Sequence, residues 1–207
     1  NNRTDWLFNS KIKGIDQVDK LFIIGCDPKR EATVLNARIR KRWLSGDLEI
    51  ISLCSPNDLT YEVKNLGNDI SLLSNSNFFK NIKSFFNNAK YPMIILGDSI
   101  LSTEEGEKIH GSIKNLSDDC KIIRDNWNGF CVLSPYASRS GGLEIGFLPL
   151  KNGLNVKQIR KKISEKKIKL LFLIEADDFD LSGLDSKATK IVYLGHHGDK
   201  HATKADI

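Results

Sequence analysis

The chain has 207 residues, 40% of them hydrophobic, and its 31 basic and 26 acidic side chains give a formal net charge of +5. This length fits one large domain or two small lobes, and the composition is that of an ordinary folded domain. No apolar run approaches the roughly 20 residues that cross a bilayer, and the small net charge does not indicate a nucleic-acid partner.

The predicted elements alternate between short apolar runs and longer amphipathic stretches. Most of the apolar runs lack a two-residue alternation, which is typical of parallel strands covered by helices on both faces. In chain order the predicted elements are strand 21–24, helix 31–44, strand 50–53, helix 75–89, strand 93–96, helix 103–116, strand 121–123, helix 156–165, strand 170–174 and strand 191–194. This order predicts an α/β fold with parallel sheets built from Rossmann-like βαβ lobes.

The chain contains an internal echo. The residues 21–27 resemble 171–177, because in both a strand ends, a small turn follows, and an Asp comes next. We therefore expect a first lobe at 1–116, a turn-rich connection at 117–153 and a second segment at 154–207. The absence of an initial Met and the strand-like final residues lead us to expect a piece of a longer protein, with the second segment truncated at its C-terminus.

The four cysteines, Cys26, Cys54, Cys120 and Cys131, are widely spaced and contain no C-x-x-C pair. Such spacing disfavours a zinc or iron–sulphur site made by this chain. Three of them lie in or beside apolar runs, which predicts reduced, buried thiols and a reducing compartment.

Gly25-Cys26-Asp27-Pro28 follows the first predicted strand, where open α/β sheets bind ligands. No complete phosphate-binding fingerprint is present. Two interpretations remain open: a helix N-terminus that holds a phosphate, or a tight turn in which Asp27 caps the helix.

The histidine-rich stretch at 196–201 is the second candidate site. His196, His197 and His201 could bind a metal, which would support a metal-dependent or hydrolytic function. Adjacent His side chains in an extended segment point to opposite faces, however, so we favour structural histidines. No nucleophile with an acid–base partner stands out, and we expect no catalytic or metal-binding residue.

The helical region around 29–42 is strongly basic. Nucleic-acid binding, a solvated face and a docking surface for an acidic neighbour are the three interpretations. The region lacks interleaved aromatic residues suited to base stacking, so we favour docking or solvation.

Several short motifs, in order along most of the chain, resemble the family of large iron–sulphur subunits of respiratory complex I, the NADH–quinone oxidoreductase. They are Gly25-Cys26-Asp27-Pro28, the stretch 36–41, Asp58-Leu59-Thr60-Tyr61 with Leu66-Gly67, the stretch 92–97, Ala137-Ser138-Arg139 with 143–147, and 195–199 followed by Ala205-Asp206. The resemblance implies that the iron–sulphur clusters belong to a Cys-rich part of the parent that this chain lacks. It also implies a region similar to molybdopterin oxidoreductases, whose α/β lobes clasp a guanine dinucleotide cofactor.

In complex I this region is expected to hold no molybdenum cofactor, and the sequence departs from a cofactor binder accordingly. Asp27 and Glu175 place carboxylates at turns where phosphates would sit. The candidate residues of a vestigial cleft are Gly25, Asp27, Glu175, Asp177, His196 and His197.

The functional hypothesis is a non-catalytic structural domain of complex I. We expect it in the peripheral arm, on the cytoplasmic side of a bacterial inner membrane, with other peripheral-arm subunits as partners and neither nucleic-acid binding nor membrane insertion. The alternative is a module that still binds a nucleotide or molybdopterin.

Overall fold

The computed structural model describes residues 2–56, 58–136, 138–198 and 200–207. Ala137 and Asp199, which belong to two of the sequence motifs, lie outside the described residues. The chain forms two compact units, 1–146 and 147–207, and each is described by itself. Among the described residues no helix is both long enough and apolar enough to cross a membrane.

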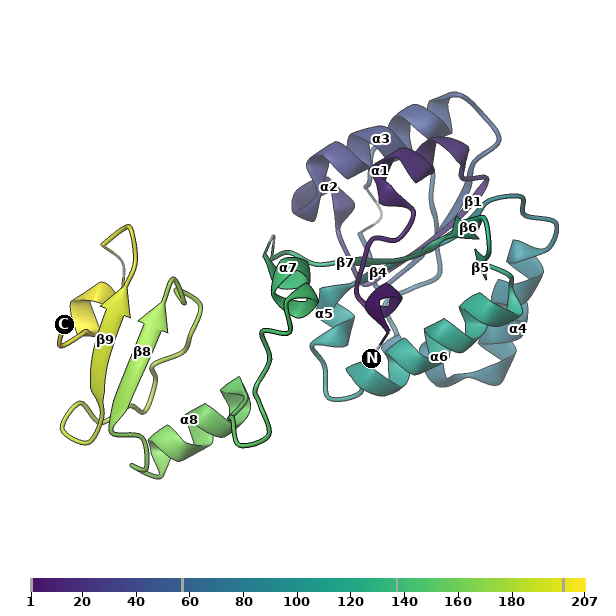
Figure 1. Cartoon of the computed structure of the whole chain (residues 1–207). Coiled ribbons are helices and arrows are strands. Elements are labelled where there is room, and N and C mark those ends of the chain that lie inside the picture. Colours follow the sequence, from purple (N-terminus) through teal and green to yellow (C-terminus); the bar gives the residue numbers. More distant parts are fainter. Residues whose placement is uncertain (1, 57, 137, 199) are drawn as a thin grey trace. The chain divides into compact units, whose positions relative to one another are not determined.

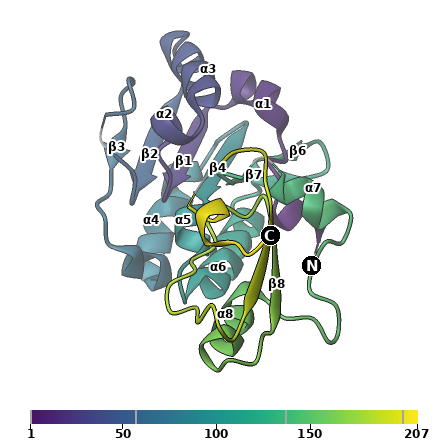
Figure 2. The ribbon, with the colours of Figure 1, turned by 90° about the vertical axis from the view of Figure 1, so that its left-hand side faces the viewer.

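Unit 1 is built on a five-stranded parallel sheet whose strand order is β3-β2-β1-β4-β7 (Figure 2). The strands are β1 (Lys20–Ile24), β2 (Glu49–Leu53), β3 (Lys64–Asn65), β4 (Pro92–Gly97) and β7 (Phe130–Leu133). β1 lies between β2 and β4, with Lys20 opposite both Glu49 and Pro92.

Helices cover both faces of this sheet, as Figure 1 shows. One layer consists of α1 (Lys11–Gly14), α2 (Pro28–Glu31) and α3 (Thr33–Leu44), and the other of α4 (Ser76–Phe86), α5 (Asp98–Leu101) and α6 (Gly106–Asp119). Successive side chains of β1 alternate between the two layers: Phe22 and Ile24 pack in the core that includes α4 and α6, while Leu21 and Ile23 pack in the core that includes α3. The predicted parallel α/β fold is confirmed.

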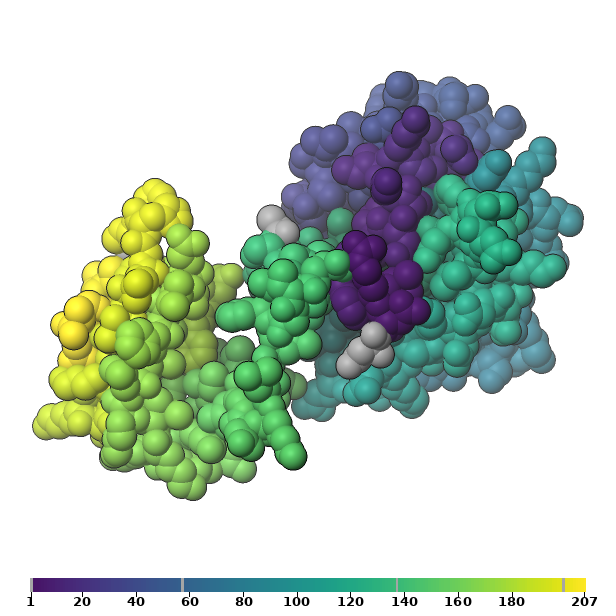
Figure 3. Space-filling view, in the orientation of Figure 1, coloured from purple at the N-terminus to yellow at the C-terminus, as the bar shows by residue number. Residues whose placement is uncertain are grey.

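The N-terminal segment covers the β7 edge of the sheet, and Figure 3 shows it lying along the surface of unit 1. Phe8 forms an antiparallel bridge with Cys131, and the Val132 amide donates to the Leu7 carbonyl at 3.0 Å. The turn Arg3–Asp5 that precedes this segment is tied to α6, because Lys114 donates to the Asp5 carboxylate. An edge strand that would otherwise expose unpaired backbone is thereby covered.

The predicted strand at 121–123 is wrong as a member of the parallel sheet. β5 (Ile123–Arg124) instead pairs antiparallel with β6 (Trp127–Asn128) in a short hairpin. The fifth parallel strand is β7, which was not predicted although Phe130–Leu133 is an apolar run. The residues 117–146 of the predicted connection therefore belong to unit 1, where they supply its edge strand β7 and α7 (Arg139–Glu144).

Unit 2 contains α8 (Val156–Ser164) and a two-stranded parallel sheet of β8 (Leu170–Ile174) and β9 (Lys190–Leu194). One face of this sheet packs Leu171, Leu173 and Ile191 against α8 and the β8–β9 crossover. The other face leaves Phe172 and Ile174 exposed by 57% and 67%. The expectation of two covered faces thus holds in unit 1 but not within unit 2.

Replacing Asp5 by Asn should lower the free energy of unfolding of unit 1 by about 1 kcal/mol at neutral pH. Burial opposes the shift, but hydrogen bonds from Lys114 and the Asn2 amide and the Lys114 charge together hold the pKa of Asp5 below its ordinary value of 3.8. A lowered pKa in the folded state stabilises above the unfolded value, and this contribution is lost as pH falls through the folded value. The difference between parent and variant should therefore shrink below about pH 4.

Urea titrations monitored by tryptophan fluorescence measure this effect in unit 1 alone, because Trp6, Trp43 and Trp127 all lie there. The control is Lys83→Met, which removes the more exposed Lys83–Asp119 pair and should cost less than about 0.5 kcal/mol. Equal effects of the two variants, or a difference that does not depend on pH, would contradict the assignment.

Candidate functional site

The carboxyl ends of β1 and β4 form the point at which the strand order of unit 1 reverses. From β1 the chain continues outward through β2 and β3, whereas β4 and β7 lie on the other side. Crevices at such reversal points are the usual ligand sites of open α/β sheets. Gly25 and Gly97 lie at these two strand ends and therefore decide whether a crevice exists.

The two glycines leave no space for a side chain between the strand ends. A Cβ atom added to Gly97 would lie 2.1 Å from the Gly25 carbonyl oxygen, and one added to Gly25 would lie 2.1 Å from Cγ1 of Ile100. The Ser99 hydroxyl donates to the same Gly25 carbonyl. Backbone and the side chains of α5 thus occupy the reversal point.

Asp27 caps α2. Its carboxylate accepts a hydrogen bond from the Lys29 amide at 3.1 Å, and its own amide donates to the Glu31 carboxylate at 2.8 Å. Arg30 Nε lies 3.6 Å from the second Asp27 carboxylate oxygen. The sequence left open a phosphate-binding helix N-terminus or a tight turn in which Asp27 caps the helix. The structure shows the second arrangement.

A buried carboxylate, which ends the strand–turn–Asp pattern of Met93 to Asp98 in the sequence, lies beside this turn. Asp98 follows β4, is 6% exposed, and accepts a hydrogen bond from the Ser102 hydroxyl at 3.2 Å. A guanidinium nitrogen of Arg139 in α7 lies 3.3 Å from it. Because Asp98 and Arg139 are 41 positions apart, no short-range sequence pattern predicted that they pair. Each of the two charges has its partner within unit 1.

Cys26, the thiol nearest to the reversal point, is unsuited to nucleophilic chemistry. Its side chain is almost fully buried among apolar neighbours. Burial, together with the nearby Glu31 and Asp27 carboxylates, raises the pKa of this thiol far above its ordinary value. The reactive thiolate is therefore suppressed.

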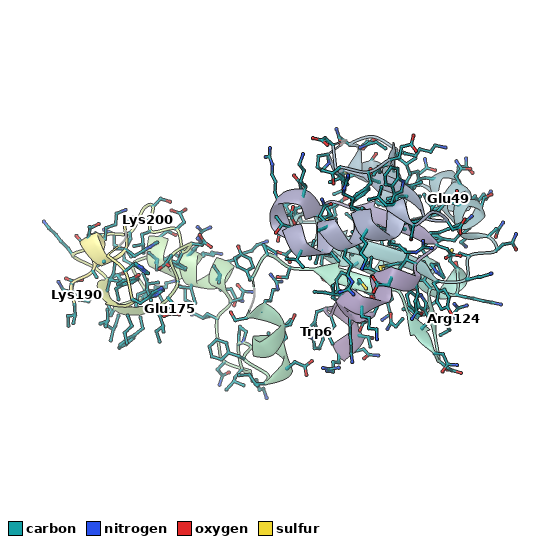
Figure 4. The ribbon with its side chains drawn as sticks, turned by 90° about the horizontal axis from the view of Figure 1, so that it is seen from above. Trp6, Glu49, Arg124, Glu175, Lys190 and Lys200 are labelled. Carbon is teal, nitrogen blue, oxygen red and sulfur yellow. The ribbon has the colours of Figure 1, made fainter. Side chains whose placement is uncertain are left out.

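Unit 2 repeats the local geometry of the β1 turn. Glu175, labelled in Figure 4, has a left-handed backbone with φ 47°, and Gly25 has φ 59°. The Glu175 amide donates to Leu194, the last residue of β9, at 2.8 Å; the Gly25 amide donates to Leu53, the last residue of β2, at 2.9 Å. The similarity between residues 21–27 and 171–177 in the sequence is thus also a similarity of structure, in which β8 and β9 correspond to β1 and β2.

The polar candidates of unit 2 lie near the ends of its two strands and pair with one another. Asp177 accepts a hydrogen bond from the Tyr193 hydroxyl at 3.0 Å. His196 Nδ1 lies 3.4 Å from the Glu175 carboxylate, and the rings of His196 and His197 meet with centroids 4.3 Å apart. The side chains of both Glu175 and His196 are two-thirds exposed, so the interaction between them is weakened by solvent.

The three histidines do not converge. His201 is buried and its Nε2 lies 2.6 Å from the Phe179 carbonyl, whereas the side chain of His196 faces solvent beside Glu175. Within 2–56, 58–136, 138–198 and 200–207, no group of three or more His, Cys, Asp or Glu side chains is placed to hold a metal.

Unit 1 has several hollows on its surface. A groove of about 780 Å³ follows the β2–β3 edge beside Trp43 and Phe78, and another of about 460 Å³ lies between Leu35 and Tyr136. A shallower hollow of about 380 Å³ follows β2. None of these three hollows is lined by Gly25 or Asp27.

The whole chain, residues 1–207, matches the family model of the molybdopterin oxidoreductases and belongs to that family. It is 36% identical over 99% of its length to the G subunit of NADH-quinone oxidoreductase from Rickettsia bellii and covers 28% of that protein. It is equally similar, over 99% of its length, to the mitochondrial 78 kDa subunit of NADH-ubiquinone oxidoreductase of Neurospora crassa, of which it covers 26%. The likeness to complex I large subunits that the motifs predicted is confirmed, and the chain spans less than a third of these relatives.

A solved structure of the formyltransferase/hydrolase complex FhcABCD from Methylorubrum extorquens, in complex with methylofuran, has a similar fold. The TM-score is 0.55, with 13% identity over 91% of this chain and 60% of that one. At this identity the likeness concerns the fold alone.

Replacing Gly97 by Ala should destabilise unit 1 by about 3 kcal/mol, because the new Cβ would collide with the Gly25 carbonyl. The matched control is Gly111→Ala, at an exposed position inside α6 with nothing within 4 Å, which should stabilise by about 1 kcal/mol. Urea unfolding monitored by tryptophan fluorescence measures both. A tolerated Gly97→Ala would mean that the reversal point has room.

Replacing Glu175 by Gly should stabilise unit 2 by about 1 kcal/mol, since a left-handed backbone favours glycine. The expected result is slower amide hydrogen exchange of Leu171 and Leu173 in β8. The reciprocal control, Gly25→Ala, should instead destabilise unit 1, because it combines the same backbone strain with a clash against Ile100. Unchanged or faster exchange in Glu175→Gly would contradict the equivalence of the two turns.

Proposed function

We propose that this chain is a non-catalytic structural domain in the large subunit of a complex I-type NADH–quinone oxidoreductase. The observation that carries the proposal is the close packing at the reversal point, where a Cβ added to Gly25 or Gly97 would collide with Ile100 or with the Gly25 carbonyl. The curated relatives are named as subunits of such oxidoreductases, and this supports the parent.

The proposed role is mechanical. In the parent, electrons would pass from NADH through iron–sulphur clusters held by other parts of the polypeptide, toward quinone. Long-range electron transfer requires fixed distances between clusters, and a sheet packed on both faces resists deformation. The chain itself would hold no cofactor and would lie in the peripheral arm, on the cytoplasmic side of a bacterial inner membrane, among other arm subunits.

The alternative is a domain that still binds a guanine nucleotide or molybdopterin. Membership of the molybdopterin oxidoreductase family favours it. The Asp27 cap opposes it, because a carboxylate already takes the amide that a phosphate would use. Glu175 adds a second carboxylate at the equivalent turn of unit 2.

Calorimetric titration of the purified chain with GTP, GDP and molybdopterin guanine dinucleotide tests the proposal. We expect no saturable binding stronger than about 1 mM, equivalent to about −4 kcal/mol. The double variant Asp27→Asn/Glu175→Gln distinguishes repulsion by the carboxylates from lack of room for a ligand. It removes both negative charges, and Asn at position 27 still caps the helix. It should bind no better, because backbone and α5 fill the site. Saturable binding by the parent chain would overturn the structural role.

A further inference from the structure

Unit 2 carries the most concentrated charge of the chain. The stretch 151–169 contains eight basic residues and one acidic residue, Glu165. α8 lies inside this stretch and begins with a reciprocal capping box between Asn155 and Gln158. The helix is therefore well defined at its start, and this sets the face of the helix on which each basic residue lies.

Packing divides the side chains of α8 into two sets. Ile159 and Ile163 face β8 and belong to the apolar core of unit 2. Lys157 and Lys161 are one helical turn apart on the opposite side, and both are exposed. Lys162 is also exposed, on the flank of the same helix.

These three lysines form no ion pair with any residue that the structure describes, whereas three neighbouring cations do. Arg160 pairs with Asp180 at 3.0 Å, Lys166 with Asp185 at 3.0 Å, and Lys167 with Glu165 at 2.7 Å. The nearby acidic residues thus pair with the flanking cations. The positive charges on the outer face of α8 are left without an acidic partner among the described residues.

The arrangement is unfavourable for the helix alone. Like charges at positions i and i+4, as in Lys157 and Lys161, repel each other. Lys157 also lies in the first turn, at the positive end of the helix dipole. Carboxylates of a partner would remove both penalties at once.

α3, the basic helix favoured by the sequence as a docking face, differs in this respect. Arg38 makes a double hydrogen bond with Asp16, and Arg40 donates to the Thr60 carbonyl at 2.9 Å. Lys29, on α2, is 2.6 Å from Asp58. Half of the six cations of this region, Lys29, Arg38 and Arg40, therefore connect separate segments of unit 1.

We propose that the face of α8 formed by Lys157, Lys161 and Lys162 docks onto an acidic surface of a neighbouring protein subunit, an inference that rests on the proposed function. An anionic membrane is less favoured, because a surface helix inserts an apolar side and that of α8 is already packed against β8. Nucleic acid is less favoured, because α8 contains no aromatic residue for stacking on bases.

The test replaces all three lysines by Glu in the full natural polypeptide, expressed in cells that lack the parental copy. The measurement is the fraction of the polypeptide that co-migrates with NADH–quinone oxidoreductase activity on native gels of mild detergent extracts. The matched control, Lys13→Glu/Lys80→Glu/Lys108→Glu, makes the same charge change at exposed positions of unit 1 that form no ion pair with described residues. Circular dichroism of both purified variants checks folding.

The α8 variant should reduce the assembled fraction about tenfold, the control should leave it near the parental level, and rising salt should weaken parental assembly more than that of the α8 variant. Equal assembly of the α8 variant and the parent would overturn the docking face. Parental protein that never co-migrates with the activity would instead overturn the proposed function. Lysine-dependent binding of the purified chain to phosphatidylglycerol vesicles or to duplex DNA, with assembly intact, would reassign the face and overturn the proposal.

Discussion

The close approach of two backbone turns, at Gly25 and Gly97, is the constraint on which unit 1 depends. Parallel strands held in register bring their carboxyl ends to one edge, and here the turns meet with no space for a Cβ between them. The same contact sets the start of α5 and places Ile100 over the first turn. Open α/β sheets commonly keep a crevice at this point, whereas here the two turns pack against each other. The contact between Gly25 and Gly97 therefore both stabilises unit 1 and closes the reversal point.

The predictability of the fold follows from the kind of signal that each element leaves. β1 and β4 are uninterrupted apolar runs, so both strands and their parallel pairing could be predicted from the sequence. The end of the sheet could not, because the apolar residues before Asp125 form a hairpin strand and those after Gly129 form the real fifth strand. Local propensity favoured both segments, and only the packing of β7 beside β4 decides between them.

The features of the candidate site also differ in whether the local sequence could predict them. The Asp27 cap was one of two interpretations, since Asp followed by Pro is a local signal for a helix start. The pairing of Glu175 with Gly25 was also local, because it rests on similar strand ends. The proximity of Asp98 and Arg139 could not be predicted, since it depends on how α7 follows β7. The same holds for Arg38 in α3, whose partner Asp16 comes from a different segment.

The N-terminal segment across β7 has a consequence for the order of folding. Asn9 donates to the carbonyl of Phe130, which lies 121 positions later in the chain. At a synthesis rate of about 5–20 residues per second, the partner of this contact leaves the ribosome roughly ten seconds after Asn9 does. The segment that contains Phe8 and Asn9 therefore cannot join the sheet until β7 has been synthesised. Contacts so distant in sequence raise the contact order, which slows folding, so closing this sheet edge belongs to the late events of folding.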